Sequence, residues 1–124
     1  MESLMHINNI RVLARNTPEV SEYSIAEEKR LQGAPMQRLE NHYSSPCEQF
    51  HTGIWQSETG TWKVNYTEHE YCEILEGNSV ISDEQGNHLE VGPGDRFVIP
   101  AGFRGNWQVT VPCRKLYVVF ESNR

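Results

Sequence analysis

The chain has 124 residues, a length that fits a single domain built around one hydrophobic core. Its 11 Lys and Arg residues against 17 Asp and Glu residues give a formal net charge of −6. An acidic surface without a basic stripe argues against nucleic acid as a partner, and no apolar run approaches the roughly 20 residues that a membrane-spanning helix needs. The N-terminal residues lack the layout of a secretory signal. We therefore expect no nucleic-acid and no membrane partner.

The three cysteines, Cys47, Cys72 and Cys113, are odd in number, widely spaced and without a CxxC pair. This pattern argues against a disulfide framework and against a structural zinc site. It favours a reducing, cytoplasmic compartment, and it predicts thiols that are packed in or near the core.

The first 35 residues differ in pattern from the rest of the chain. Ser24 and Glu27 have the spacing of a capping box, and Gly33 is a typical residue at a helix C-terminus. The sequence predicts an N-terminal arm over residues 1–35 with one short helix at about residues 25–32.

From residue 36 onward, short runs of alternating apolar and polar residues follow one another at the roughly 8–12-residue spacing of an all-β sandwich or barrel. The runs expected as strands are MQRLENHY, QFHTGIWQS, TWKVNYT, YCEILEG, NSVISDE, HLEVG, DRFVIPA, RGNWQVTV and RKLYVVFE. Gly86, between two alternating runs, predicts a hairpin turn over residues 83–87. Because no helical pattern separates these runs, residues 36–124 are expected to form an all-β antiparallel barrel or jelly roll.

Two segments of this region resemble the signature motifs of the cupin superfamily. In EYCEILEG, Glu70 and Gly77 keep the interval of the first motif, and in GDRFVIPAGFRGNW, Gly94, Pro100 and Gly102 keep that of the second. The resemblance implies an RmlC-like double-stranded β-helix, the jelly-roll barrel of the cupins, preceded here by a short N-terminal helix.

Further residues resemble a small single-domain branch of these proteins, grouped with the cupin domain of (S)-ureidoglycine aminohydrolase. The shared features are a GxW at residues 53–55, Tyr66, a PxGxxGxW at residues 100–107 and an RKxY at residues 114–117. Cupins of this size commonly pair, so the resemblance also implies a homodimer with residues 1–35 as an exchanged or edge-covering segment.

The metal ligands of the cupin motifs are missing apart from Glu70. The other ligand positions are occupied by residues of different chemistry, which are Val64 and Tyr66 (or Lys63 and Asn65 in the neighbouring register), and Gly105. One carboxylate does not make a divalent metal site, in which three or four N or O ligands must converge. We therefore expect neither a metal nor another cofactor; His51 with Glu70 is the one pair from which a metal site would be rebuilt.

Strand alternation predicts which side chains face the lumen of the barrel. With Glu70 pointing inward, Cys72 points inward too, and Tyr66 shares its face with Trp62. Position 105 pointed inward as a ligand, so Trp107 follows on the same side, and Gly105 is expected to leave open space there. The expected ligand-binding residues are Trp55, Trp62, Cys72, Arg104 and Trp107.

Glu70 is the expected catalytic acid or base, with Tyr66 orienting the substrate. A carboxylate inside an apolar barrel loses hydration energy, and Arg104, Lys115 or Tyr66 is the expected partner that would offset this loss. A carboxyl group whose charged form is disfavoured by burial is suited to take up and release a proton near neutral pH. The alternative is that Glu70 is inert and bonded to its neighbours.

Three functional hypotheses follow. The favoured one is a metal-independent small-molecule-binding protein with its pocket inside the barrel. The second is an enzyme acting on a small nitrogenous or acidic metabolite, as in ureidoglycine aminohydrolase. The third is a metal-free sugar-nucleotide isomerase or epimerase, which requires a His base paired with an Asp and a Tyr acid in the lumen, with His51 as the single candidate for the base. Whether the protein is an enzyme stays open at this point.

Overall fold

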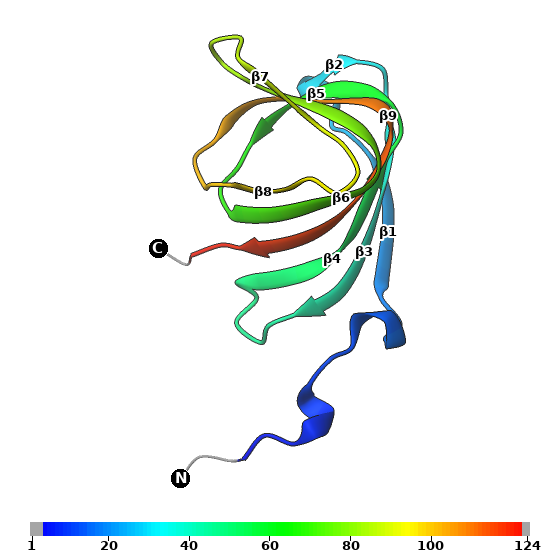
Figure 1. The fold of residues 1–124 in the computed structure, drawn as a ribbon, viewed down its shortest axis with the longest axis vertical. Coiled ribbons are helices and arrows are strands. Elements are labelled where there is room, and N and C mark those ends of the chain that lie inside the picture. Colours follow the sequence, from blue (N-terminus) through cyan, green and yellow to red (C-terminus); the bar gives the residue numbers. More distant parts are fainter. Residues whose placement is uncertain (1–3, 123–124) are drawn as a thin grey trace.

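The alternating runs of the sequence form the strands of an all-β cupin barrel in the computed structural model, which describes residues 4–122 (Figure 1). The strands are β1 (Glu19–Ser24), β2 (Arg30–Gln32), β3 (Met36–Ser44), β4 (Phe50–Ser57), β5 (Gly60–Asn65), β6 (His69–Asp83), β7 (His88–Val91), β8 (Arg96–Ile99) and β9 (Arg104–Phe120). The helical segments of the described residues are single 3-10 turns: η1 (Ile7–Asn9), η2 (Leu13–Arg15) and η3 (Glu27–Lys29).

Two long strands hold the barrel together. β9 pairs with β4 through its second half and with β5 through its first half, and it pairs with β6 along nearly its whole length. The sheet runs in the order β1-β3-β4-β9-β5-β2, and β6 adds β7 and β8, all in antiparallel pairs. The sequence runs expected as four separate strands are therefore two continuous strands, because bulges let β6 and β9 bend without breaking their pairing.

Gly77 marks the bend of β6. Its φ of 82° lies in the left-handed region, and a Cβ atom at this position would come within 2.0 Å of the Pro112 carbonyl oxygen on β9. Only glycine fits both conditions. The expected hairpin is confirmed as well: the Asp83 N–H donates to the Asn87 carbonyl oxygen at 3.0 Å, and Gly86 has a φ of 87°.

The N-terminal helix is shorter than the sequence predicts. Instead of a helix over residues 25–32, the structure has the one turn η3 and then β2, which pairs with β5 through Arg30 opposite Trp62. Ala26 rather than Ser24 precedes the turn, and it makes no side-chain cap. The open edge of β5 offers interstrand hydrogen bonds that a two-turn helix with few apolar residues does not match. Residues 19–32 thus extend the sheet of the barrel.

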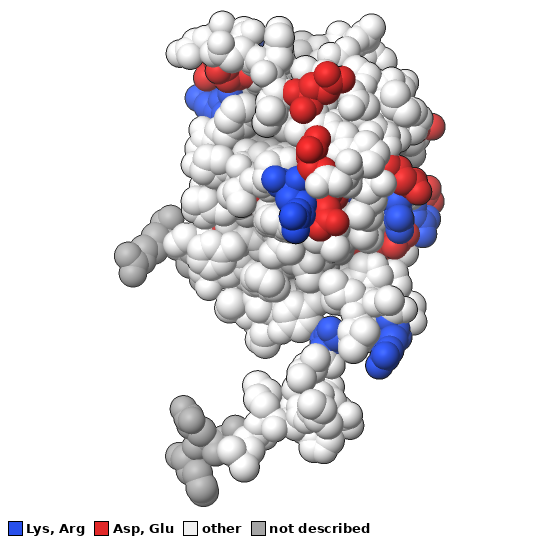
Figure 2. Space-filling view, in the orientation of Figure 1, with Lys and Arg blue, Asp and Glu red and all other residues white. Residues whose placement is uncertain are grey.

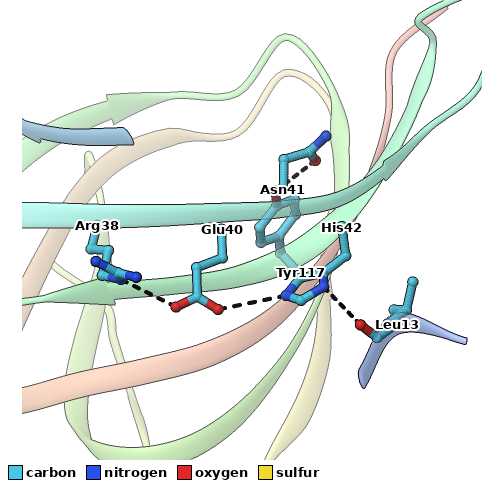
Figure 3. Close-up of polar contacts among 6 residues, drawn as sticks. All are labelled: Leu13, Arg38, Glu40, Asn41, His42 and Tyr117. Carbon is cyan, nitrogen blue, oxygen red and sulfur yellow. Dashed lines mark hydrogen bonds and ion pairs between the residues drawn. The ribbon is translucent and has the colours of Figure 1, made fainter. Parts of the chain in front are cut away.

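Figure 1 shows the segment before β1 leading away from the strands, and a hydrogen bond from β3 holds it near its end. The Nδ1 atom of His42 on β3 hydrogen-bonds to the Leu13 carbonyl oxygen of η2 at 3.0 Å (Figure 3). On its other side, His42 Nε2 lies 3.5 Å from Glu40 Oε1, and Arg38 Nε donates to Glu40 Oε2 at 3.1 Å. This polar row fixes η2 beside β3.

The core consists of alternate residues of the barrel strands. On β9, Trp107, Val109, Cys113, Lys115, Tyr117 and Val119 are all buried, whereas the residues between them are not. On β6, Glu70, Cys72 and Ile74 are buried, which confirms the predicted inward face of that strand. Across the described residues, no helix is long and apolar enough to cross a membrane.

Candidate functional site

One cavity of about 480 Å³ opens inside the barrel. It lies on the concave face of β3, β4, β9 and β5, and the beginning of β6 contributes to its wall. Five aromatic rings line it, and these are Trp55, Trp62, Tyr66, Trp107 and Tyr117. The chain has three tryptophans in total, so all of them belong to this wall. A mostly apolar cavity with a few polar groups is the usual form of a small-molecule site.

The cavity contains a buried ion pair between β6 and β9. The Nζ atom of Lys115 lies 3.2 Å from Oε2 of Glu70. Glu70 is 6% exposed and Lys115 is 4% exposed, so water hardly screens either charge. Glu70 therefore does not stand alone in an apolar barrel: of the three stabilising partners that the sequence offered, Lys115 makes the ion pair.

Two tryptophan rings enclose the Lys115 ammonium. Its Nζ atom lies 4.7 Å from the centroid of Trp55 and 4.4 Å from that of Trp107. The indole N–H groups of these rings donate elsewhere, to Gln37 Oε1 at 3.2 Å and to Ser79 Oγ at 3.1 Å. The ring faces are thus free to attract the cation.

Lys115 is held in its charged form. Burial by itself lowers the pKa of this amine, but the adjacent Glu70 carboxylate, together with Cys72 and Tyr66, more than offsets that effect, and the net shift of the Lys115 pKa is upward. A protonated amine has no lone pair for attack on a carbonyl group. In this cavity Lys115 acts as a fixed positive charge and not as a nucleophile.

Tyr66 and Cys72 lie next to the ion pair and stay protonated. Burial raises the pKa of the Tyr66 hydroxyl, with Lys115 opposing the rise and Glu70 adding to it. Burial likewise raises the pKa of the Cys72 thiol to about 12. Tyr66 is therefore a hydrogen-bonding group of the wall. Cys72 is fully buried behind the cavity lining, so it supports the pair from below and does not face the open space.

The loop between β5 and β6 brings a second carboxylate, that of Glu68, to the cavity wall. Two backbone hydrogen bonds fix this loop: the Tyr66 N–H donates to the Phe103 carbonyl, and the Gly102 N–H donates to the Tyr66 carbonyl. Glu68 is half-buried as a result. Burial and the nearby Glu70 raise its pKa.

Polar side chains from β3 and β4 complete the wall. The Tyr117 hydroxyl donates to Asn41 Oδ1 at 2.9 Å. It does so because Gly53, the glycine of the GxW sequence, leaves room for it: a Cβ at Gly53 would lie 2.8 Å from the Tyr117 hydroxyl and 1.9 Å from the Glu40 carbonyl oxygen. This glycine therefore shapes the wall, and Trp55 two residues later supplies a ring of the cavity.

The structure places two residues of the second motif outside the barrel cavity in which the sequence analysis expected them to act. Arg104 is exposed and lines a separate outer groove with Lys63 and Asp83, away from the barrel cavity. Gly105 does not open space beside Trp107, because a Cβ there would come within 1.9 Å of the Ser82 carbonyl oxygen on β6. A glycine is required at position 105 because the backbones of β6 and β9 approach each other closely there.

The sequence model of the EutQ-like cupin domain matches residues 44–117, which is more than half of the chain. The chain belongs to the EutQ-like cupin family. A comparison with curated proteins found no match.

Solved structures agree with the fold of this EutQ-like cupin domain. A DUF861-family protein of unknown function from Pseudomonas syringae pv. tomato superposes with a TM-score of 0.74 at 24% identity over 82% of this chain, which spans 44% of that protein. The EutQ protein of Clostridium difficile gives a TM-score of 0.64 at 17% identity over 81% of this chain and 82% of its own. A DUF861-family protein from Thermotoga maritima is 35% identical over 52% of this chain and 74% of its own, with a TM-score of 0.51.

The residues of this cupin domain do not fit a metal ion of the kind the fold commonly holds. Within the described residues, no group of three or more His, Cys, Asp and Glu side chains converges as ligands would. The Glu70 carboxylate contacts an ammonium instead of a metal ion. His51 lines the cavity, but its Nδ1 atom is 2.6 Å from Ser44 Oγ and its Nε2 atom 3.0 Å from the Glu48 carbonyl oxygen, so both ring nitrogens have partners.

Lys115 and Glu68 are the charged site residues that the sequence analysis did not predict. Lys115 was considered as a partner for Glu70 but not as a group of the site. The sequence contained a signal for its role: by strand alternation Lys115 lies on the same inward face of β9 as Cys113 and Tyr117, where a lysine is unusual. Glu68 carried no such signal, because it lies in a loop whose path depends on the tertiary structure.

Proposed function

We propose that this EutQ-like cupin domain binds a small molecule inside the barrel without the help of a metal ion. The observation that carries this proposal is the buried Glu70–Lys115 pair in the wall of the 480 Å³ cavity. The retained motif carboxylate contacts an ammonium of the chain itself, so Lys115 takes the place next to Glu70 that an external cation would otherwise occupy.

The walls support binding rather than simple packing. The aromatic rings give a large apolar area at small loss of side-chain entropy, and the hydroxyl of Tyr66 and the charged groups give direction to a bound molecule. A ligand that displaces water from such rings gains free energy with the area it buries. Trp55, Trp62 and Trp107 remain the proposed ligand-contacting residues, with Tyr66 and Glu70 as the polar ones.

A second candidate is an enzyme that acts on a small nitrogenous or acidic metabolite, the activity implied by the resemblance to ureidoglycine aminohydrolase. The protonated Tyr66 beside Glu70 supports it, because such a hydroxyl is able to donate a proton or a hydrogen bond to a reacting group. The isomerase or epimerase hypothesis has less support. His51 is bonded to Ser44 and to a backbone carbonyl, and no Asp pairs with it among the described residues.

Tryptophan fluorescence tests the binding proposal directly, because every tryptophan of the chain lines the cavity. Benzyl alcohol is a suitable neutral probe, and we expect it to shift the emission in a saturable manner before and after dialysis against EDTA. The variant Val64→Phe, which narrows the cavity, should weaken the effect, whereas Val98→Phe on the exposed face of β8 should not. Equal responses of the two variants, or dependence on a metal, contradict the proposal.

We also propose that the protein is a homodimer. The segment before β1 exposes five apolar side chains to solvent, which are Leu4, Met5, Ile7, Ile10 and Val12. Figure 2 shows that acidic and basic side chains are interspersed over the barrel, so the exposed apolar side chains of this segment are what a second copy would cover. Light scattering on the full chain and on Ile7→Ser/Ile10→Ser tests the proposal: the variant should be a monomer, and a monomeric wild type contradicts it.

A further inference from the structure

The lining of the barrel cavity contains more carboxylate groups than ammonium groups. Its lining holds two carboxylates, Glu68 and Glu70, and one ammonium, Lys115. His51 also lines the cavity; its ring nitrogens are bonded to the Ser44 hydroxyl and the Glu48 carbonyl oxygen, and it makes no ion pair among the described residues. Since Lys115 is paired with Glu70, one carboxylate charge of the wall is left without a cationic partner.

That remaining charge belongs to Glu68. Within residues 4–122, no ion pair includes this side chain. Burial and then the acidic neighbours Glu70 and Glu121 disfavour its ionisation, and His51 and Lys115 relieve this only in part, so the pKa of Glu68 is raised. In the protein without ligand, the surroundings of Glu68 thus disfavour the ionised form of its carboxylate.

A second and independent observation lies at the base of the same cavity. One oxygen of Glu70, Oε2, accepts from Lys115, but the other, Oε1, is buried and has no hydrogen-bond partner. A buried carboxylate oxygen without a donor is unfavourable. Because Glu70 lines the cavity, a bound ligand is in a position to supply that donor.

From the unpaired carboxylate of Glu68 and the unpartnered oxygen of Glu70, we infer that the ligand is a compact monocationic amine with an apolar or aromatic body. Its ammonium group pairs with Glu68 and supplies N–H donors to the acidic part of the wall. Its body lies against rings that Lys115 does not cover, those of Trp62 and Tyr66. The inference rests on the proposed binding function and adds the ligand class.

The two other ligand classes fit the cavity less well. A carboxylate or phosphate would bring a further negative charge to a wall that already has an uncompensated one, in a chain with a net charge of −6. A neutral ligand would fill the volume but leave Glu68 as it is. Lys115 does not repel the amine strongly, because Glu70 and the two tryptophan rings already compensate its charge.

Three probes of one carbon skeleton separate these classes: benzylamine, benzyl alcohol and benzoate, titrated at pH 7.5 with tryptophan emission and calorimetry as readouts. We expect benzylamine to bind about tenfold more tightly than benzyl alcohol, the effect of one hydrogen-bonded charge pair, and benzoate to bind most weakly. Glu68→Gln should remove the preference for the amine and leave the alcohol unchanged. The matched variant Glu84→Gln, on the exposed hairpin, should behave as the wild type.

The outcomes distinguish the ligand class from the binding function. Equal affinities for amine and alcohol, tighter binding of benzoate, or an amine preference that survives in Glu68→Gln overturn the amine inference while the binding function stands. If none of the three probes changes the tryptophan emission, the cavity does not take molecules of this kind, and the proposed function fails together with the inference.

Discussion

Removing the ammonium of Lys115 by Lys115→Met is the sharpest test of the buried ion pair. Methionine keeps much of the volume and the contact with the two rings, but it leaves Glu70, which is 6% exposed, without its cation. Loss of one partner of a buried pair costs about 3–5 kcal/mol. For a domain of this size, that corresponds to a decrease in Tm of roughly 10–20 °C.

The double variant Glu70→Gln/Lys115→Met separates the pair from the packing around it. Because no unpaired charge remains buried, we expect it to recover most of the loss, with a coupling free energy of about 2 kcal/mol or more. Urea unfolding followed by far-UV circular dichroism measures both variants and Glu70→Gln, independently of the tryptophans that contact Lys115. Additive effects of the two single substitutions would refute the reasoning, because they would show that the charges do not interact.

Three further predictions concern other parts of the molecule. The raised pKa of Glu68 means that the stability this residue contributes is present at low pH and is lost as the pH rises through that pKa. Glu68→Gln should therefore raise Tm at pH 7–8 by roughly 1–3 °C, a small shift because solvent screens the carboxylate. Thermal melts at several pH values would test this, because the difference between the two proteins should vanish in acid. Gly105→Ala should destabilise the fold by about 2–3 kcal/mol in urea unfolding, because its Cβ has no space beside the Ser82 carbonyl; unchanged stability would contradict the close approach of the strands. A thiol reagent should modify exposed Cys47 quickly, since a hydrogen bond lowers the pKa of that thiol, and Cys72 only after unfolding; rapid reaction of Cys72 in the native protein would show that its burial is wrong.

The sequence predicted the barrel because its strand signals are local. Alternation with period two, a turn at Gly86 and the intervals of two motifs suffice to define an all-β cupin, and the same alternation identifies the inward residues of β6 and the face shared by Trp62 and Tyr66. The helix near residues 25–32 was overestimated for a complementary reason. Its capping residues are a local signal too, but the edge of β5 offers that segment a competing set of hydrogen bonds.

The second motif shows where motif spacing fails as a guide to side-chain position. From the spacing alone, Gly105 was expected to leave a gap in the lumen and Arg104 to face a ligand. In the structure β6 and β9 approach each other so closely at Ser82 that no side chain fits at position 105. Spacing along one strand cannot report the distance to the strand beside it.

By itself, the sequence determined that this protein is a cupin barrel whose inward face has lost three metal-ligand positions and kept Glu70. It could not determine what compensates that carboxylate. Glu70 and Lys115 are far apart along the chain, and they meet because β6 and β9 pair in a register that puts Val119 opposite Glu70 and Lys115 opposite Ile74, from where the long lysine side chain extends along the lumen. The unbalanced charge of Glu68 has the same origin. Electrostatic balance in a cavity depends on which distant segments line it, and only the closed barrel decides that.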